Sequence, residues 1–243
     1  FQPINNIHFG ETTHHEVLIR LRGEDGKIIP PDAFLASAAR FGMMSEIDFW
    51  IIENAARAYE KYSQERSPLK LSINVSANAF EADDLVPHIR QVFDTYNVDP
   101  RHIIFEITES LAVRHPPHVE QQIAAIREMG CEFALDDFGT GYSSFSDLQK
   151  LQFDYIKIDG SFVEDMLNKP VDQKMIKLIA EIAHEAGMKT IAEYVQDVES
   201  LALLEELGVD LAQGYFVGKP SKEPRPSSTP ISLGYQRLHR THS

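Results

Sequence analysis

The sequence predicts an α/β fold, a (β/α)8 barrel in which helices surround a ring of strands. Short runs rich in Val, Ile and Phe alternate with longer amphipathic stretches, which is typical of strands alternating with helices around a parallel sheet. We count about eight such runs, the number of strands that closes a barrel of this kind. A chain of 243 residues, 43% of them hydrophobic, is long enough to bury the core of one such domain.

The elements follow one another along the chain in alternation. The predicted strands are residues 1–4, 16–22, 70–76, 102–109, 132–138, 155–159, 189–195 and 211–217. The predicted helices are residues 45–65, 118–129, 171–186 and 198–207, and Gly187 and Gly208 follow the last two as glycines that end helices do. In the first helix, the side expected to face the core carries Ile47, Trp50, Ile51, Asn54, Ala55 and Ala58.

Two segments are expected to lie outside the ring. Residues 23–34 have the turn residues of a loop or short hairpin that leads into a helix near Asp32. Beyond Pro220 the sequence is rich in Pro, Ser and basic residues, so we expect a barrel over residues 1–220 and a tail over 221–243. The chain opens directly on a strand, and we expect it to belong to a larger multidomain protein.

Charge and cysteine content limit the classes of function and the cellular compartments that fit this chain. A formal net charge of −14 argues against a nonspecific binder of DNA or RNA, because such proteins neutralise phosphates with Lys and Arg. A phosphate ligand would need help from cations. The single Cys131 rules out an internal disulfide and favours a buried thiol in a reducing compartment. We find no apolar stretch of the length that spans a membrane, so we expect a cytoplasmic domain without membrane contact.

Polar side chains gather where the predicted strands end, which is where parallel barrels build their active sites. They are Glu16, Asn74, Glu106, Glu109, Asp136, Asp137, Lys157, Asp159, Glu193 and Gln213. A single acidic residue there is usually a solvated loop residue or a helix cap. Carboxylates packed together at one mouth would repel one another unless a cation lay among them. Glu16, Asn74, Glu106, Asp136 and Asp137 offer only oxygen ligands, so we expect Mg²⁺ or Mn²⁺.

Adjacent aspartates favour two ions, because one carboxylate can bridge both while the other binds the second. A pair of ions about 3.5 to 4 Å apart is the arrangement that hydrolyses phosphodiesters. Lys157 could then hold the attacking water, and Glu193 could orient it or take its proton. For Lys157 alone, a structural ion pair explains the residue equally well. Glu16, Leu18 and Arg20 share one face of an extended run and offer a metal ligand, an apolar surface and a phosphate-binding guanidinium.

These residues resemble the EAL domain family of cyclic di-GMP phosphodiesterases. The motif that names the family appears as "EVLIR", and further family blocks follow in order as "INVSANAF", "FEITES", "LDDFGTGYSS", "DYIKIDGSF", "IAEYV" and "QGYFVGKP". The likeness extends from Gln2 to Pro220. It implies a barrel whose first strand runs antiparallel to its neighbour, hydrolysis of cyclic di-GMP to linear pGpG with two metal ions, and a homodimer.

The resemblance also implies a role for each matching position. The metal ligands would be Glu16, Asn74, Glu106, Asp136 and Asp137. Lys157, Glu193 and the metal-bound Asp137 would act on the attacking water. Glu109 would steady the loop that contains the second aspartate and the residues after it, 137–145. Contacts to the dinucleotide and its surroundings would come from Gln2, Leu18, Arg20, Gln196, Gln213, the "GYF" segment of Gly214, Tyr215 and Phe216, and Pro220.

The sequence departs from the family at several points. Gln196 stands where the family usually has Glu, and a neutral amide forms a weaker hydrogen bond to a guanine edge. Ala39 replaces another Glu, and because the sequence opens on the first strand we expect the barrel without the helix that usually precedes this strand. His14 and His15 lack the spacing of a zinc helix, and we expect them in a loop. Two alternatives stay open, a receptor that binds cyclic di-GMP without cleaving it and, last, a protein-binding scaffold.

Overall fold

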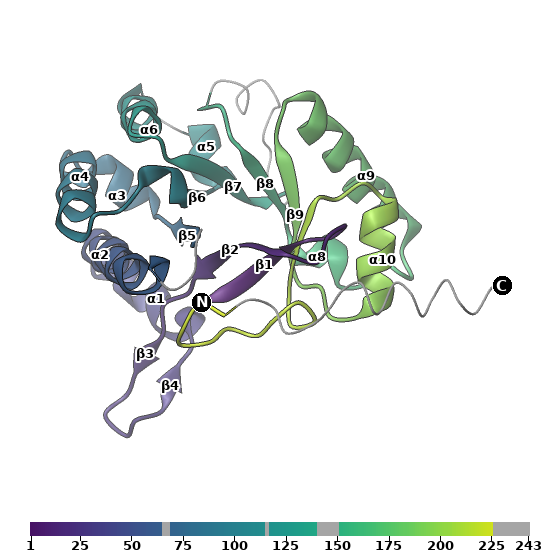
Figure 1. Ribbon diagram of the computed structural model, residues 1–243, viewed down its shortest axis with the longest axis horizontal. Helices are drawn as coiled ribbons and strands as arrows, with labels where there is room; N and C mark the ends of the chain where they lie inside the picture. Colours follow the sequence, from purple (N-terminus) through teal and green to yellow (C-terminus); the bar gives the residue numbers. More distant parts are fainter. Residues whose placement is uncertain (65–68, 115–116, 140–150, 226–243) are drawn as a thin grey trace.

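Eight strands form one closed barrel. The computed structural model describes residues 1–64, 69–114, 117–139 and 151–225 (Figure 1). The strands are β1 (Gln2–Asn6), β2 (Thr12–Val17), β5 (Leu71–Asn74), β6 (Ile103–Thr108), β7 (Glu132–Phe138), β8 (Tyr155–Ile158), β9 (Lys189–Ala192) and β10 (Leu211–Gln213). Their order around the ring is β1-β10-β9-β8-β7-β6-β5-β2. The predicted barrel is confirmed.

The first strand is antiparallel to both of its neighbours, β2 and β10, whereas the other neighbouring strands are parallel. Residues 7–11 connect β1 to β2, and this segment is far too short for the crossover that parallel neighbours need. The chain therefore folds straight back and pairs Gln2 with Glu16. This antiparallel start, expected from the family resemblance, brings Gln2 and Glu16 side by side at the mouth of the barrel.

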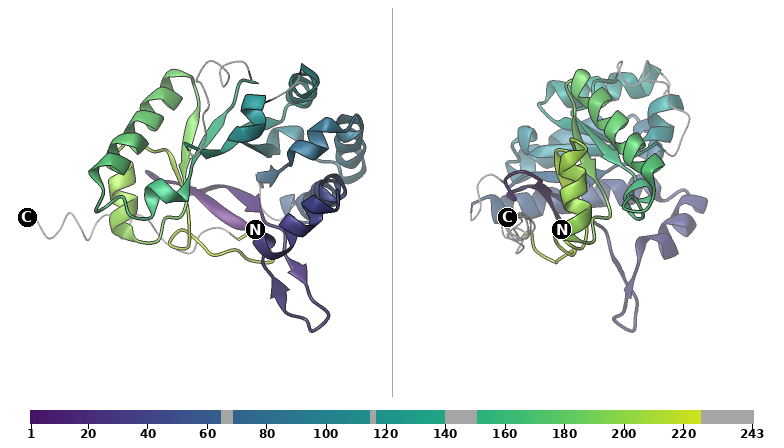
Figure 2. Two further views of the ribbon diagram at one scale, coloured as in Figure 1. Left: turned by 180° about the vertical axis from the view of Figure 1, so that it is seen from behind. Right: turned by 90° about the vertical axis from the view of Figure 1, so that its right-hand side faces the viewer.

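Helices cover the outside of the ring, as Figures 1 and 2 show. They are α1 (Pro31–Arg40), α2 (Met44–Ser63), α3 (Ala77–Glu81), α4 (Leu85–Tyr96), α5 (Glu109–Arg114), α6 (Pro117–Glu128), α8 (Gly160–Val163), α9 (Pro170–Glu185) and α10 (Val198–Glu206), with a 3₁₀ turn at Pro100–His102. α6, α9 and α10 begin and end within one residue of the prediction. Gly187 and Gly208 have positive φ values of 77° and 87°, as expected of glycines that end helices.

A hairpin of β3 (Leu21–Arg22) and β4 (Ile28–Ile29) projects from the barrel and leads into α1, as predicted for residues 23–34 (Figure 2). The predicted core face of α2 is partly wrong. Ile51 and Ala55 are buried, but Trp50 is 56% exposed and Asp48 is buried in its place. The buried side of α2 is therefore rotated from the predicted one, and it brings a carboxylate against the barrel.

Two apolar layers hold the barrel together. Buried side chains from six neighbouring strands, β1 and β6 to β10, form one small cluster: Ile4, Ile104, Ala134, Tyr155, Ile191 and Leu211. A larger core lies between the strands and the helices, where Phe80, Phe105 and Phe133 are fully buried. Cys131 is a buried free thiol as predicted, and burial raises its pKa to about 12.

The second predicted strand was placed too late in the sequence. β2 begins at Thr12 and ends at Val17, so the prediction that His14 and His15 lie in a loop is wrong. Both histidines are buried because β1 and β5 pair with β2 on either side. His14 packs against the Tyr155 ring, and its burial lowers the pKa to about 3, so the imidazole is neutral. Other strands also end sooner than predicted, β9 at Ala192 and β10 at Gln213.

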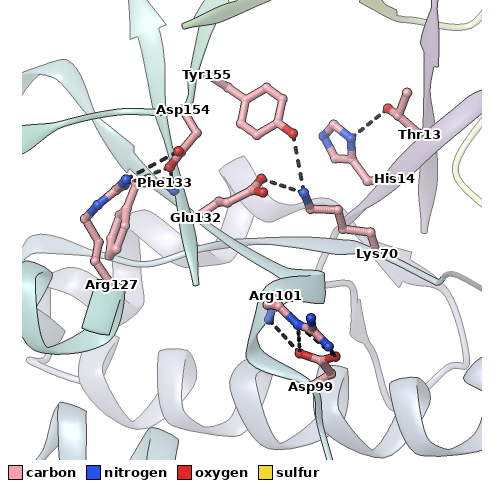
Figure 3. Close-up of polar contacts among 10 residues, drawn as sticks. All are labelled: Thr13, His14, Lys70, Asp99, Arg101, Arg127, Glu132, Phe133, Asp154 and Tyr155. Atoms are coloured by element: carbon pink, nitrogen blue, oxygen red, sulfur yellow. Dashed lines mark hydrogen bonds and ion pairs between the residues drawn. The ribbon is translucent and has the colours of Figure 1, made fainter. Parts of the chain in front are cut away.

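Polar contacts tie together the elements at the amino end of the barrel, opposite the predicted site (Figure 3). Lys70 Nζ donates to Glu132 Oε2 at 2.5 Å and lies 3.4 Å from the Tyr155 hydroxyl. The guanidinium of Arg127 forms two hydrogen bonds with Asp154, which also accepts from the backbone N–H of Phe133. These contacts anchor the starts of β7 and β8. They stabilise the amino end of the barrel, whereas active sites of such barrels lie at the carboxyl ends of the strands.

The segment after Pro220 remains attached to the barrel over its described part. Phe1 and Ser221 exchange two backbone hydrogen bonds, and His15 Nε2 lies 2.8 Å from the carbonyl oxygen of Arg225. The remainder of the predicted tail, residues 226–243, and the predicted loop residues 140–145 lie outside the described residues. In the part of the chain that is described, no helix has the length and apolar character to cross a membrane. The cytoplasmic location stays a prediction.

Candidate active site

Lys157 lies at the centre of the barrel mouth, surrounded by carboxylates. Its side chain, on β8, is 1% exposed. Lys157 Nζ lies 2.7 Å from Glu106 Oε2, and 2.9 Å from both Asp136 Oδ1 and Glu193 Oε1. Glu16 Oε1 is 3.7 Å away. Four strand ends thus converge on one cation, because neighbouring parallel strands deliver their last residues to the same rim.

Glu16 is held by amides from both sides. Asn74 Nδ2 donates to Glu16 Oε1 at 2.7 Å, and Gln213 Nε2 donates to Glu16 Oε2 at 2.5 Å. Gln213 also approaches Gln2 Oε1 at 3.3 Å, and Gln2 Nε2 donates to the Gly218 carbonyl. Both Glu16 oxygens are therefore fixed, and the Asn74 amide oxygen is left to face a ligand.

Burial and charge shift the pKa values of this cluster in opposite directions. Burial raises the pKa of Glu106 to about 8, against the opposing effect of Lys157. Burial likewise raises the pKa of Glu193 to about 7. For Lys157, burial alone would lower the pKa, but Glu106 and the other carboxylates around it raise the pKa well above its ordinary value. Lys157 is thus a permanent cation, while the carboxylates lack enough positive charge to ionise together.

Asp136 and Asp137 both contribute to the mouth, although adjacent side chains on a regular strand point to opposite faces. The pairing of β7 with β8 shifts register between Leu135 and Phe138, and Asp137 has a left-handed φ of 56°. This irregularity lets oxygens of Asp136, Asp137 and Glu193 lie within 4.8 Å of one another, close enough to share a cation. Burial, followed by the nearby Asp136, raises the pKa of Asp137.

The donor atoms of the mouth fit a hard divalent cation. Among the described residues, the buried Glu106 Oε1 has no hydrogen-bond partner, and Asp136 Oδ1 has only its ion pair with Lys157. Such atoms are costly unless a ligand satisfies them. All the candidate donors are oxygens, the atoms that Mg²⁺ and Mn²⁺ prefer.

A pocket of about 430 Å³ opens beside this cluster. It is lined by Gln2, Glu16, Leu18, Arg20, Glu193, Tyr194, Gln196, Gln213, Gly214, Tyr215 and Pro220. Leu18 and Arg20 follow the end of β2, yet they line the same pocket as Glu16, as their alternation in the sequence predicts. Of the predicted substrate-binding residues, Phe216 alone is absent from the lining, and it packs against the outer core instead.

The pocket residue Tyr194 was missed by the sequence analysis, whereas Tyr215 belongs to the "GYF" segment that the family resemblance placed against the dinucleotide. The two residues are 60% and 66% exposed. Tyr194 has a left-handed φ of 63° and packs on Gly160, where an added Cβ would lie 2.9 Å from the Tyr194 side chain. An aromatic residue close to the end of a predicted strand was the available signal for Tyr194, because a flat ring suits stacking on a base.

Glu109, predicted to steady the loop after the aspartates, reaches that loop's first described residues. Gly139 donates its backbone N–H to Glu109 Oε2 at 3.1 Å. An added Cβ on Gly139 would lie 2.7 Å from the Phe162 ring, and its φ is 101°, so only glycine fits there. The end of β7 is therefore tied to the start of α5, directly beside Asp136 and Asp137.

The structure is an eight-stranded barrel with an antiparallel first strand, and its acidic mouth surrounds a buried lysine with carboxylates that fit a cation. A sequence model described as the EAL domain matches residues 1–220. The chain belongs to the EAL domain family.

The matches to known relatives extend over most of this chain. It is 34% identical to the cyclic di-GMP phosphodiesterase PdeF of Escherichia coli and 34% identical to the cyclic di-GMP phosphodiesterase PdeB of Shewanella oneidensis, each over 90% of this chain. The chain spans only 29% and 26% of the length of these two relatives. A solved PaMucR phosphodiesterase structure in complex with c-di-GMP matches with a TM-score of 0.85 and 27% identity, over 96% of this chain and 91% of that one.

Proposed function

We propose that this chain hydrolyses cyclic di-GMP to linear pGpG with the help of two Mg²⁺ or Mn²⁺ ions. The observation that carries the proposal is the ring of carboxylates around Lys157, next to a pocket lined by Arg20 and two exposed tyrosines. The names of the curated relatives and the bound ligand of the PaMucR structure support the choice of substrate. Membership of a larger signalling protein remains a prediction.

The cations would be held by Glu16, Asn74, Glu106, Asp136 and Asp137. When bound, two such ions supply a hydroxide from water at neutral pH and neutralise charge on the phosphate. The chain's own contribution is to fix these oxygens before binding. Asn74 and Gln213 orient the Glu16 carboxylate, and the irregularity in β7 turns Asp136 and Asp137 toward one another.

Lys157 and Glu193 would act on the attacking water. The surrounding carboxylates raise the pKa of Lys157, and a protonated Lys157 can donate a hydrogen bond that holds a water oxygen in place. Glu193 lies beside Lys157, 2.9 Å from its Nζ, and lines the pocket, so its carboxylate can accept the proton of a water that binds next to the pair.

The pocket would bind the dinucleotide around the scissile phosphate. The Arg20 guanidinium suits a phosphate, and Gln2 and Gln196 offer amides to polar edges. Tyr194 and Tyr215 present exposed ring faces on which guanine bases can stack. The neutral Gln196 forms a weaker contact than a carboxylate would.

Site-directed variants test the assignment. Asp137→Asn and Glu16→Gln should abolish metal-dependent conversion of cyclic di-GMP, measured by chromatography, while circular dichroism shows an intact fold. Asp165→Asn is the control, because Asp165 forms an exposed ion pair with Lys169 and lines neither the carboxylate cluster nor the pocket. Wild-type turnover in Asp137→Asn would contradict the metal site. Binding of cyclic di-GMP without hydrolysis by the wild-type chain would make it a receptor.

We further propose a homodimer formed through α9. Leu167, just ahead of the helix, and Val171, Met175 and Leu178 on it follow helical spacing and are 37% to 70% exposed. Lys174 and Lys177 lie in the first half of the helix, which also carries Asp172 in its first turn, and Glu181 and Glu185 lie in its second half. An antiparallel second copy would therefore pair opposite charges around an apolar centre.

Sedimentation velocity tests the dimer. Val171→Asp together with Met175→Glu should convert the wild-type dimer to a monomer, because both substitutions place carboxylates in the apolar stripe. The control Phe9→Asp changes an exposed aromatic residue outside α9. A wild-type chain that sediments as a monomer at micromolar concentration would refute the proposal.

A further inference from the structure

Asp48 is a buried carboxylate that the proposed reaction does not use. It lies on α2, is 3% exposed, and its described partners are both on one residue. Asp48 Oδ2 accepts from the backbone N–H of Ser76 at 3.1 Å and from its hydroxyl at 2.5 Å. Burying a carboxylate away from water costs free energy unless its hydrogen bonds compensate, so the position of Asp48 needs an explanation.

Ser76 lies two residues beyond the end of β5, where Asn74 enters the proposed cation site. The intervening Val75 donates its backbone N–H to the carbonyl oxygen of Glu106, another proposed ligand. The Asn74 Nδ2 group is committed to Glu16 Oε1, so the direction of its free oxygen depends on where the backbone at 74–76 lies. A shift of this segment would move Asn74 and Glu106 relative to Glu16.

We propose that Asp48 is a positioning residue for the cation site. By holding both donors of Ser76, it fixes the end of β5 and so the direction in which Asn74 presents its amide oxygen. The anchor is rigid because Asp48 lies within the 20-residue helix α2, whose neighbours Ile51 and Ile52 are buried against the barrel. The inference rests on the proposed function, since it needs a cation at Asn74.

A purely structural role makes a different prediction. Ser76 is also the N-cap of α3, so Asp48 would then stabilise only the start of a five-residue helix. Loss of that contact would lower the unfolding temperature without changing the affinity for a cation. Metal affinity, measured without substrate, therefore separates the two roles. Removal of groups that orient a metal ligand typically weakens binding about 10- to 100-fold.

The test is calorimetric titration of the purified chain with Mn²⁺, joined to kcat and KM for cyclic di-GMP. Asp48→Ala removes both hydrogen bonds, Ser76→Ala removes one, and Asp48→Asn keeps an oxygen acceptor. Asp210→Ala is a closely matched control. Asp210 Oδ2 accepts from the N–H and the hydroxyl of Thr190 at 2.8 and 2.9 Å, at the opposite end of the barrel.

We expect the Mn²⁺ Kd to rise about 10- to 100-fold in Asp48→Ala and less in Ser76→Ala, and to stay near the wild-type value in Asp48→Asn and Asp210→Ala. At saturating Mn²⁺, kcat of Asp48→Ala should return toward wild type. An unchanged Kd in Asp48→Ala and Ser76→Ala would overturn the positioning role while leaving the proposed function intact. Wild-type chain that binds no Mn²⁺ would overturn the cation site and this inference together. If Asp48→Ala fails to fold, Ser76→Ala decides: a raised Mn²⁺ Kd supports the positioning role, and a wild-type Kd overturns it.

Discussion

Replacing Lys157 by Met should destabilise the metal-free chain and abolish turnover without weakening metal binding. The substitution keeps an unbranched side chain, one atom shorter, but removes the cation that lies within 2.9 Å of three carboxylates. Removing one partner of a buried ion pair costs about 3 to 5 kcal/mol. For a chain of this size, that loss corresponds to a fall in Tm of about 10 °C in EDTA.

Metal should reverse much of this loss, because divalent cations supply the positive charge that Lys157 provided. We therefore expect the Tm difference between Lys157→Met and wild type to be smaller in Mn²⁺ than in EDTA, and Mn²⁺ affinity to be at least that of wild type. The removal of a group that orients the water should lower kcat by about 10²-fold or more.

Differential scanning calorimetry with and without Mn²⁺ measures the stability, and chromatography of the dinucleotides measures turnover. Lys70→Met is the control, because Lys70 also pairs with a carboxylate, Glu132, but at the amino end of the barrel. Its Tm loss should be the same in EDTA and in Mn²⁺. Equal Tm losses in both conditions for Lys157→Met, or a kcat within a few-fold of wild type, would refute the reasoning.

Three further predictions follow from other residues. Tyr194→Ala should raise KM for cyclic di-GMP about 10-fold in steady-state kinetics, because a base stacked on an aromatic ring gains about 1 to 3 kcal/mol, whereas Tyr194→Phe should keep the wild-type KM. Gln196→Glu should lower KM about five-fold in the same assay, because a charged acceptor forms a stronger hydrogen bond; an unchanged KM would place Gln196 away from the base. Burial raises the pKa of Asp48 from 3.8 to about 6, so the folded chain holds this proton more tightly than the unfolded chain does. Its contribution of about 3 kcal/mol is present below pH 3.8 and lost as the pH rises through 6, so urea unfolding should show Asp48→Asn gaining about that much relative to wild type between pH 4 and 7.

The barrel could be predicted because its signals are local. Runs such as residues 132–138 are apolar, bounded by turns and of strand length, and β7 has those bounds in the structure. The helices α9 and α10 end at glycines that were visible in the sequence. The antiparallel first strand was expected only from the family resemblance, although the short 7–11 connection provides its physical reason.

Other features depend on contacts between distant residues, which periodicity does not report. His14 and His15 are polar enough to suggest a loop, yet pairing with β1 and β5 buries them in β2. Asp48 interrupts the apolar side of α2 because it accepts hydrogen bonds from Ser76. That partner lies 28 positions away in the sequence, outside the helical pattern from which the buried side was predicted. Sequence alone placed Asp136 and Asp137 at the rim, but only the register shift in β7 explains how both can face one cation.

The most direct test of the central claim is to incubate the purified chain with cyclic di-GMP in Mn²⁺, with an EDTA sample beside it, and to separate cyclic from linear dinucleotide by chromatography. We predict conversion to pGpG in Mn²⁺ and none in EDTA, because the carboxylates around Lys157 require cations to act on a phosphodiester. Conversion at the same rate in EDTA would contradict the metal mechanism. An intact cyclic dinucleotide in Mn²⁺ would contradict the proposed activity.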